Sequence, residues 1–259
     1  MQIKSILLFI IFAALSCKKN NIPKVVSNDL DICIYGGTSA GIIAAVSASK
    51  MGKSVIIITP KDHVGGMTVG GLGRTDVGMR QSISGLARDF YRRLGTEYGT
   101  AEAWAFEPHV AERIFLELLA EERIKIIYKS ELINVTKQRN VIQSIAIRDP
   151  IKGDTTTIRA KVYIDDSYEG DLMARSGISY TVGREANTVY QEEFNGVDPE
   201  TMHTIPHQFP DGVDPYIIEG DSTSGLVSGV ADLPLADKGS SDGKIQAYNF
   251  RLTSFSRIH

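Results

Sequence analysis

Cysteine is scarce in this 259-residue sequence, which contains Cys17 and Cys33 and no other. Two cysteines cannot form a disulfide framework, and they cannot supply the four thiolate ligands of an iron–sulfur cluster. The single tryptophan, Trp104, is expected in the core rather than as a stacking platform. Disulfide-rich scaffolds and iron–sulfur carriers are therefore excluded.

An excess of positive charge is also lacking, because 28 Lys and Arg residues stand against 31 Asp and Glu residues and the formal net charge is −3. We therefore expect no basic patch that attracts nucleic acid, and we predict no nucleic-acid partner. The hydrophobic content of 42% and the charged content of 23% are ordinary for a globular protein. The length allows one or two domains with a sizeable core.

The apolar run at the amino terminus, from Ile6 to Leu15, is too short to cross a membrane. As a helix it spans about 15 Å, half of a bilayer core of about 30 Å, which is typical of a signal-peptide core. The following "ALSC" resembles a bacterial lipobox. We therefore expect a signal peptide over residues 1–17, a lipid anchor on Cys17, a polar tether over residues 18–28 and a location in the bacterial cell envelope. Ordinary secretion with cleavage near Ser16 remains the alternative.

Residues 30–60 have the pattern of a parallel βαβ unit. Leu30–Tyr35 and Ser54–Thr59 are apolar and rich in β-formers, as in strands buried on both faces. Ser39–Met51 predicts a helix that ends at Gly52. About 30 residues for strand, helix and strand is the usual length of such a unit, so the sequence predicts an α/β fold.

The turn of this unit, "GGTSAG" at residues 36–41, predicts a dinucleotide site. Gly36 permits a sharp turn, Gly41 permits close helix–strand packing, and the free N–H groups at the helix start would bind a pyrophosphate. Thr38 narrows the approach to the phosphates, although its hydroxyl can donate to one. No Lys-Ser/Thr pair follows Gly41, which excludes a phosphate-loop NTPase. A tight turn that binds no ligand remains the alternative.

Thr59 stands at the end of the second strand, where an acid usually accepts from the ribose hydroxyls. Threonine can make one such bond but contributes no charge, so we expect weaker ribose recognition. It argues against a nicotinamide cofactor, and an NAD-dependent dehydrogenase is kept as a further alternative.

A second glycine-rich segment, residues 62–79, contains six glycines and is expected to lie close to another backbone or a ligand. Further elements are predicted as helices at Ser84–Leu94 and from Pro108, strands at Ile124–Tyr128, Leu132–Thr136, Val141–Arg148 and residues 160–165, and a helix start in "EGDLMARSG". From about Ser179 the hydrophobic periodicity weakens and few elements can be placed.

The segments "YGGTSAGIIAA", "GGMTVGGLGRTDVG", "GLARDFYRR" and "IDDSYEGDLMARSGISYTVGREAN" resemble bacterial FAD-dependent oxidoreductases of the glutathione-reductase type, whose flavin domain is similar to that of heterodisulfide reductase. The resemblance runs from Asp29 to Leu252. It implies a doubly wound (Rossmann-like) FAD-binding domain over residues 29–178 and an inserted, incomplete α+β substrate domain over residues 179–259. It also implies FAD as cofactor and hydride transfer with a small organic substrate that the sequence does not identify.

The resemblance also implies which residues contact FAD, although it assigns no catalytic acid or base. In this sequence "IDDS" replaces the more usual "IDAT", so Asp166 and Ser167 depart from the family's pattern in the later strand–turn motif. The implied contacts are with the pyrophosphate (Gly36, Gly37, Thr38, Ser39, Ala40, Gly41), the ribose (Thr59), the path to the flavin (Gly65, Gly66, Met67, Thr68), the flavin ring (Gly70, Gly71), adenine (Leu132) and a later strand–turn motif (Asp165, Gly170, Asp171).

The last residues, 253–259, match nothing in the resemblance, so we expect a truncated chain, with a non-catalytic remnant as the alternative function. His203 and His207 have Pro206 between them and no following glutamate, so we predict no metal site there. Arg184 and Glu185 are weaker candidates for the substrate side.

Overall fold

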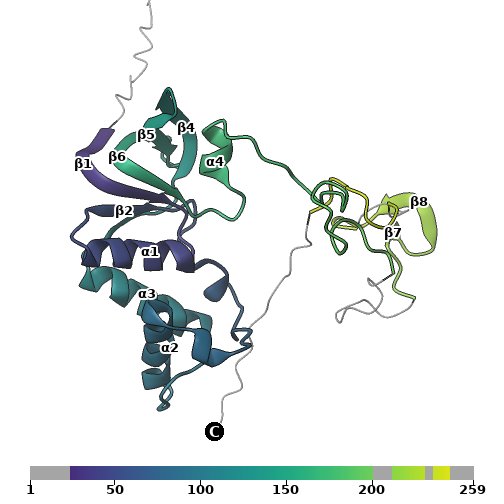
Figure 1. The fold of residues 1–259 in the computed structure, drawn as a ribbon, viewed down its shortest axis with the longest axis horizontal. Helices are drawn as coiled ribbons and strands as arrows, with labels where there is room; N and C mark the ends of the chain where they lie inside the picture. The colour runs from purple at the N-terminus through teal and green to yellow at the C-terminus, as the bar shows by residue number, and fades with distance from the viewer. Residues whose placement is uncertain (1–23, 201–211, 231–235, 246–259) are drawn as a thin grey trace, which may run out of the picture. The chain divides into compact units, whose positions relative to one another are not determined.

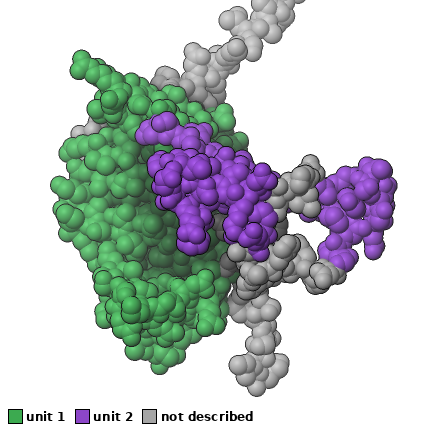
Figure 2. Space-filling view, turned by 45° about the vertical axis from the view of Figure 1, so that its right-hand side comes forward, with its two compact units in different colours: residues 1–177 green, residues 178–259 purple. Residues whose placement is uncertain are grey.

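The computed structural model describes residues 24–200, 212–230 and 236–245. The chain divides into two compact units, residues 1–177 and residues 178–259 (Figure 2). The division lies one residue from the predicted domain boundary at residue 178. Residues 1–23, with the expected signal peptide and Cys17, lie outside the described residues, as do His203 and His207.

The first unit is built on a six-stranded sheet with the order β3-β2-β1-β6-β5-β4. Strands β3, β2, β1 and β6 are parallel, whereas β5 runs antiparallel to both β4 and β6. This topology confirms the predicted α/β fold. The strands are β1 (Lys24–Tyr35), β2 (Val55–Ile58), β3 (Lys125–Ile127), β4 (Glu131–Gln138), β5 (Val141–Arg148) and β6 (Thr155–Asp165).

Helices cover one face of the parallel strands, and strands β4 and β5 with helix α4 cover the other (Figure 1). Alternate residues of β1 explain this, because Ile34 packs against the helices while Cys33 and Tyr35 pack against the antiparallel strands. Both faces are buried, which accounts for the apolar sequence of β2 and of Ile32–Tyr35 in β1. The helices are α1 (Ser39–Lys50), α2 (Gly85–Glu97), α3 (Pro108–Glu121) and α4 (Asp171–Arg175), with short 3₁₀ turns η1 (Gly66–Thr68) and η2 (Arg80–Ser82).

The aromatic residues beneath α1 lie in the core, as predicted for Trp104. Its ring stacks on Tyr91 at 4.0 Å between centroids and is 8% exposed. Phe90 stacks on Phe115 at 4.3 Å. These contacts join α2 and α3 into one layer, on which the amino end of α1 is supported.

The expected tether over residues 18–28 is wrong in its second half, because β1 begins at Lys24. Residues Lys24, Val25 and Val26 pair in parallel with Thr156, Thr157 and Ile158 of β6, and the register shifts between Val26 and Leu30. The physical reason is the length of β6, whose first residues also pair with β5 on their other side. Thr156, Thr157 and Ile158 of β6 thus have backbone partners on both sides, which satisfies their N–H and C=O groups.

The described residues of the second unit include a β-hairpin, formed by β7 (Tyr216–Ile218) and β8 (Asp221–Leu226), among loops. Arg184 and Asp242 form a backbone bridge and an ion pair that close its loops. The side chain of Arg184, a weaker candidate for the substrate side, is therefore paired with Asp242 inside the second unit. Val197, 1% exposed, is the buried apolar side chain described in this unit.

Candidate functional site

The predicted glycine turn lies between β1 and α1, at the carboxyl end of the parallel strands. Gly36 has φ +114°, and a Cβ atom there would collide with the backbone carbonyl of Asp166. Its N–H donates to the carbonyl of Ile58 at 2.8 Å, which fixes the turn to β2. Thr38 is the N-cap of α1 and Ser39 its first residue. Position Gly36 therefore requires glycine for both its conformation and its contact.

The second glycine segment meets this turn, as the sequence predicts. The N–H of Gly65 donates to the carbonyl of Gly37 at 2.6 Å, and Thr38 forms an isolated parallel bridge with Gly65. Gly65 has φ +102°, and a Cβ atom there would lie 2.6 Å from a methyl group of Val69. Two backbone segments 28 residues apart (65 − 37) are thus in direct contact at the start of α1.

Tyr168 holds the second segment from the other side, and sequence reasoning missed it. Its hydroxyl accepts the N–H of Met67 at 2.6 Å, at the start of η1. A Cβ atom at Gly66 would collide with the same hydroxyl. The two residues are 101 positions apart, and no local pattern signals such a contact.

Asp165 organises the loop that precedes α4. One oxygen of its carboxylate accepts the N–H and the O–H of Ser167 at 3.0 and 2.6 Å, and the other accepts the N–H of Met173 at 2.8 Å. The hydroxyl of Ser167 in turn accepts the N–H of Asp171 at 2.8 Å. Gly170, with φ +69°, precedes the helix. Both Asp165 and Ser167 therefore shape the loop, and Asp165 has its two carboxylate oxygens engaged within it.

Asp166 contacts the glycine turn directly. One carboxylate oxygen accepts the N–H of Thr38 at 3.0 Å, and the other accepts the Thr38 hydroxyl at 2.8 Å. A Cβ atom at Gly41 would collide with this carboxylate. Burial raises the pKa of Asp166, and the hydrogen bonds from Thr38 and from the N–H of Gly41 act against that rise.

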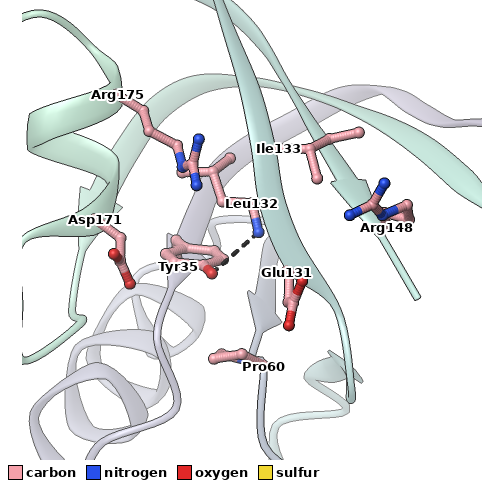
Figure 3. Close-up of a pocket in the computed structure, with 8 residues that line it drawn as sticks. All are labelled: Tyr35, Pro60, Glu131, Leu132, Ile133, Arg148, Asp171 and Arg175. Atoms are coloured by element: carbon pink, nitrogen blue, oxygen red, sulfur yellow. Dashed lines mark hydrogen bonds between the residues drawn. The ribbon is translucent and has the colours of Figure 1, made fainter. Parts of the chain in front are cut away.

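A cavity of about 540 Å³ opens beside the turn at the carboxyl ends of β1 and β2 (Figure 3). The hydroxyl of Tyr35, in a side chain only 3% exposed, accepts the N–H of Leu132 at 3.1 Å. Asp171 and Arg175 lie on one side of Tyr35, and Glu131 and Arg148 on the other. The cavity is lined by Tyr35, Pro60, Glu131, Leu132, Ile133, Arg148, Asp171 and Arg175.

Two residues that were predicted to contact FAD, Leu132 and Thr59, already make hydrogen bonds within the protein. The N–H of Leu132, expected to meet adenine, is already bonded to Tyr35. Thr59 is 2% exposed and is not among the residues that line the cavity, whereas its neighbour Pro60 is. The Thr59 hydroxyl accepts the N–H of Lys61 at 3.2 Å. The predicted ribose contact of Thr59 therefore stays a prediction, with one of its oxygen lone pairs already engaged.

Two of the titratable groups that line the cavity, Asp171 and Tyr35, have raised pKa values. Burial raises the pKa of Asp171, with the nearby carboxylates of Glu169 and Asp165 adding to the rise and Arg175 opposing it. Burial also raises the pKa of Tyr35, which keeps its hydroxyl protonated. The cavity thus combines an aromatic floor with a rim of both charge signs.

The arrangement fits FAD in shape. Glycines at which a Cβ atom would collide with neighbouring groups surround the start of α1, so the chain can come close there to a bound pyrophosphate. The adjacent cavity has room for the nucleoside part. Ser39, Ala40, Met67, Thr68, Gly70 and Gly71 lie on the two segments that meet there.

Other cofactor chemistry finds little support in the described part of the chain. No cluster of three or more His, Cys, Asp or Glu residues there could hold a metal ion. Cys33 is fully buried, and burial raises the pKa of its thiol to about 12, so it is not a reactive thiolate.

Within the described residues, no helix has the length and apolar character needed to span a bilayer.

The comparison with curated proteins gave no match. Among solved structures, the chain is similar to L-proline dehydrogenase from P. horikoshii (15% identity, TM-score 0.44, 64% of this chain and 59% of that chain). It is also similar to Thermovibrio ammonificans THI4 (19%, 0.44, 64% and 71%) and to a flavoprotein/dehydrogenase from Cytophaga hutchinsonii (15%, 0.47, 61% and 44%). The chain thus spans less than two thirds of the P. horikoshii and C. hutchinsonii proteins. Identity this low says nothing about substrate.

The family comparison extends further along the chain than the motifs did. It matches the FAD dependent oxidoreductase family over residues 31–257, so residues 253–257, expected to match nothing, fall within it. With the glycine turn, the second glycine segment and the cavity in place, FAD is the cofactor that this membership implies. The chain belongs to the FAD dependent oxidoreductase family.

Proposed function

We propose that this protein is an exported, lipid-anchored flavoenzyme that transfers a hydride between a small organic substrate and FAD. Membership in the FAD dependent oxidoreductase family supports the reaction class. When bound, FAD supplies the redox chemistry, while the protein supplies positioning and electrostatics.

The observation that carries the proposal is the closure of the second glycine segment on the first, through the Gly65 N–H and the Gly37 carbonyl. This contact brings two backbone segments together at the start of α1, where the N–H groups of Ser39 and Ala40 would bind a diphosphate. Tyr168 reinforces the closure through Met67. The residues of the turn thus bind and orient the cofactor, and the cavity around Tyr35 would hold its adenosine end.

The export part of the proposal depends on the amino-terminal sequence. The short apolar run, the "ALSC" segment and the lysines that follow it support processing at Cys17 and attachment to a bacterial membrane. Lipidation at Cys17 would place the first described residue of β1, Lys24, seven residues from the anchor (24 − 17), a span of at most about 25 Å.

The test is a visible absorption spectrum of the protein purified from the cell envelope with FAD supplied. Oxidised-flavin bands that elute with the protein when gel filtration is run in buffer containing FAD are expected. A folded but colourless protein that also fails to quench FAD fluorescence would contradict the proposal. A nicotinamide-dependent activity in such a colourless protein would favour an NAD-dependent dehydrogenase instead.

A further inference from the structure

Asp166 caps helix α1 from outside the helix. Thr38 is the N-cap by position, yet its side chain makes no capping bond, because its hydroxyl donates to Asp166. The Asp166 carboxylate also accepts the N–H groups of Thr38 and Gly41. A side chain from the end of β6 thus performs the function that the helix's own N-cap usually performs.

This carboxylate is the anion at the positive end of α1. The first turn of the helix contains no acidic residue. Helix N-termini bind one anion well because their free N–H groups and the helix dipole act together. At this helix Asp166 uses two of those backbone donors and places a negative charge beside the others.

We propose that Asp166 weakens the binding of FAD by competing with its diphosphate for the start of α1, so that the cofactor is held loosely and exchanges with solution. This inference rests on the proposed function. The donors left for the diphosphate are the N–H groups of Ser39 and Ala40. A diphosphate approaching them meets the charge of Asp166, which no basic residue in the described part of the chain pairs with in a salt bridge.

The groups around Asp166 allow its charge to be removed without rebuilding the turn. Its neighbours are the Thr38 hydroxyl and N–H, the Gly41 N–H and the backbone at Gly36, while Asp165 is the nearby carboxylate that acts on its charge. An asparagine in place of Asp166 keeps one oxygen for the Thr38 N–H, can donate its amide N–H to the Thr38 hydroxyl, and loses the charge. The competition therefore predicts tighter FAD binding in Asp166→Asn.

The experiment titrates full-length protein with FAD, ADP and adenosine and compares the wild type with Asp166→Asn. We expect Asp166→Asn to bind FAD and ADP about tenfold more tightly and adenosine equally well, because adenosine has no phosphate. Glu169→Gln is the matched control, since it removes an exposed carboxylate of the same loop that does not contact the turn. It should change FAD affinity less than twofold.

A pH series on the wild type gives a second measurement that needs no variant. Because burial raises the pKa of Asp166 above its ordinary value of 3.8, its charge is lost earlier than that of an exposed aspartate as pH falls. Wild-type FAD affinity should therefore rise over that range, and the affinity advantage of Asp166→Asn should shrink with it. Equal or weaker FAD binding by folded Asp166→Asn would overturn the inference alone, and the absence of FAD binding in both proteins would overturn the FAD assignment with it. If Asp166→Asn does not fold, wild-type FAD affinity that fails to rise as pH falls overturns the inference.

Discussion

Substitution of Ala40 by glutamate separates cofactor binding from folding. Ala40 is exposed and is the second residue of α1, beside the N–H groups expected to bind the diphosphate. At a separation of about 6 Å and an effective dielectric constant of about 20, two like unit charges repel by about 2.8 kcal/mol. Salt and solvent exposure reduce this to about 2 kcal/mol, which corresponds to roughly 30-fold weaker FAD binding.

The same substitution has the opposite effect on the helix. A glutamate in the first turn interacts favourably with the helix dipole, worth about 0.3–1 kcal/mol, with the charge of Asp166 reducing the gain. Urea unfolding of the cofactor-free protein should therefore show unchanged or slightly higher stability, while FAD titration shows the loss of affinity. Ala40→Gln is the control, because it has the same size and no charge. An Ala40→Glu protein that binds FAD as tightly as Ala40→Gln would refute the placement of the diphosphate at α1.

Three further predictions test other parts of the argument. Tyr168→Phe removes the acceptor of the Met67 N–H, which costs about 0.5–1.5 kcal/mol, so FAD titration should show affinity about threefold to tenfold weaker, and unchanged affinity would mean that this bond does not position the loop. Arg88 lowers the pKa of Glu102 below its ordinary 4.5, so the pair stabilises the fold above that pH and loses its effect as pH falls through the lowered pKa. Urea unfolding should show Glu102→Gln less stable than the wild type at pH 7, with a difference that shrinks as pH falls below 4.5, and a constant difference would contradict the assignment. Cys17→Ala should abolish incorporation of labelled palmitate and release the protein from membranes, whereas incorporation that persists in the variant would exclude the anchor.

The sequence predicted the parts of the fold that local patterns determine. The apolar runs at Leu30–Tyr35 and Ser54–Thr59 became parallel strands because both of their faces are buried. The helix predicted from Pro108 begins at that residue, since proline suits the first turn. The second glycine segment was predicted to lie close to another backbone or a ligand, because glycines have no side chain to obstruct the approach, and it contacts the backbone of the first.

The contacts that no pattern predicted join residues far apart in sequence. Tyr168 meets Met67 across 101 positions, and Asp166 meets Thr38 across 128. Each depends on how β6 ends beside the turn, which is a property of the sheet order. The early part of β1 was missed for a related reason, since Lys24 and Val25 are in a strand only because β6 is long enough to pair with them. A single sequence does not reveal such partners.

The two departures of this chain from the usual flavin-binding pattern act in the same direction. Thr59 stands where an acid commonly binds the ribose, so a negative charge that would strengthen binding is missing. Asp166 adds a negative charge at the diphosphate, where it opposes binding. One change removes an attraction and the other adds a repulsion. Their contributions to the free energy of FAD binding add when the two sites do not contact each other, so their effects on the dissociation constant multiply. Reversing both charge changes, as Thr59→Glu with Asp166→Asn, should therefore tighten FAD binding by the product of the two single effects in a double variant that folds, and a smaller gain would mean that the two positions share one turn rather than acting separately.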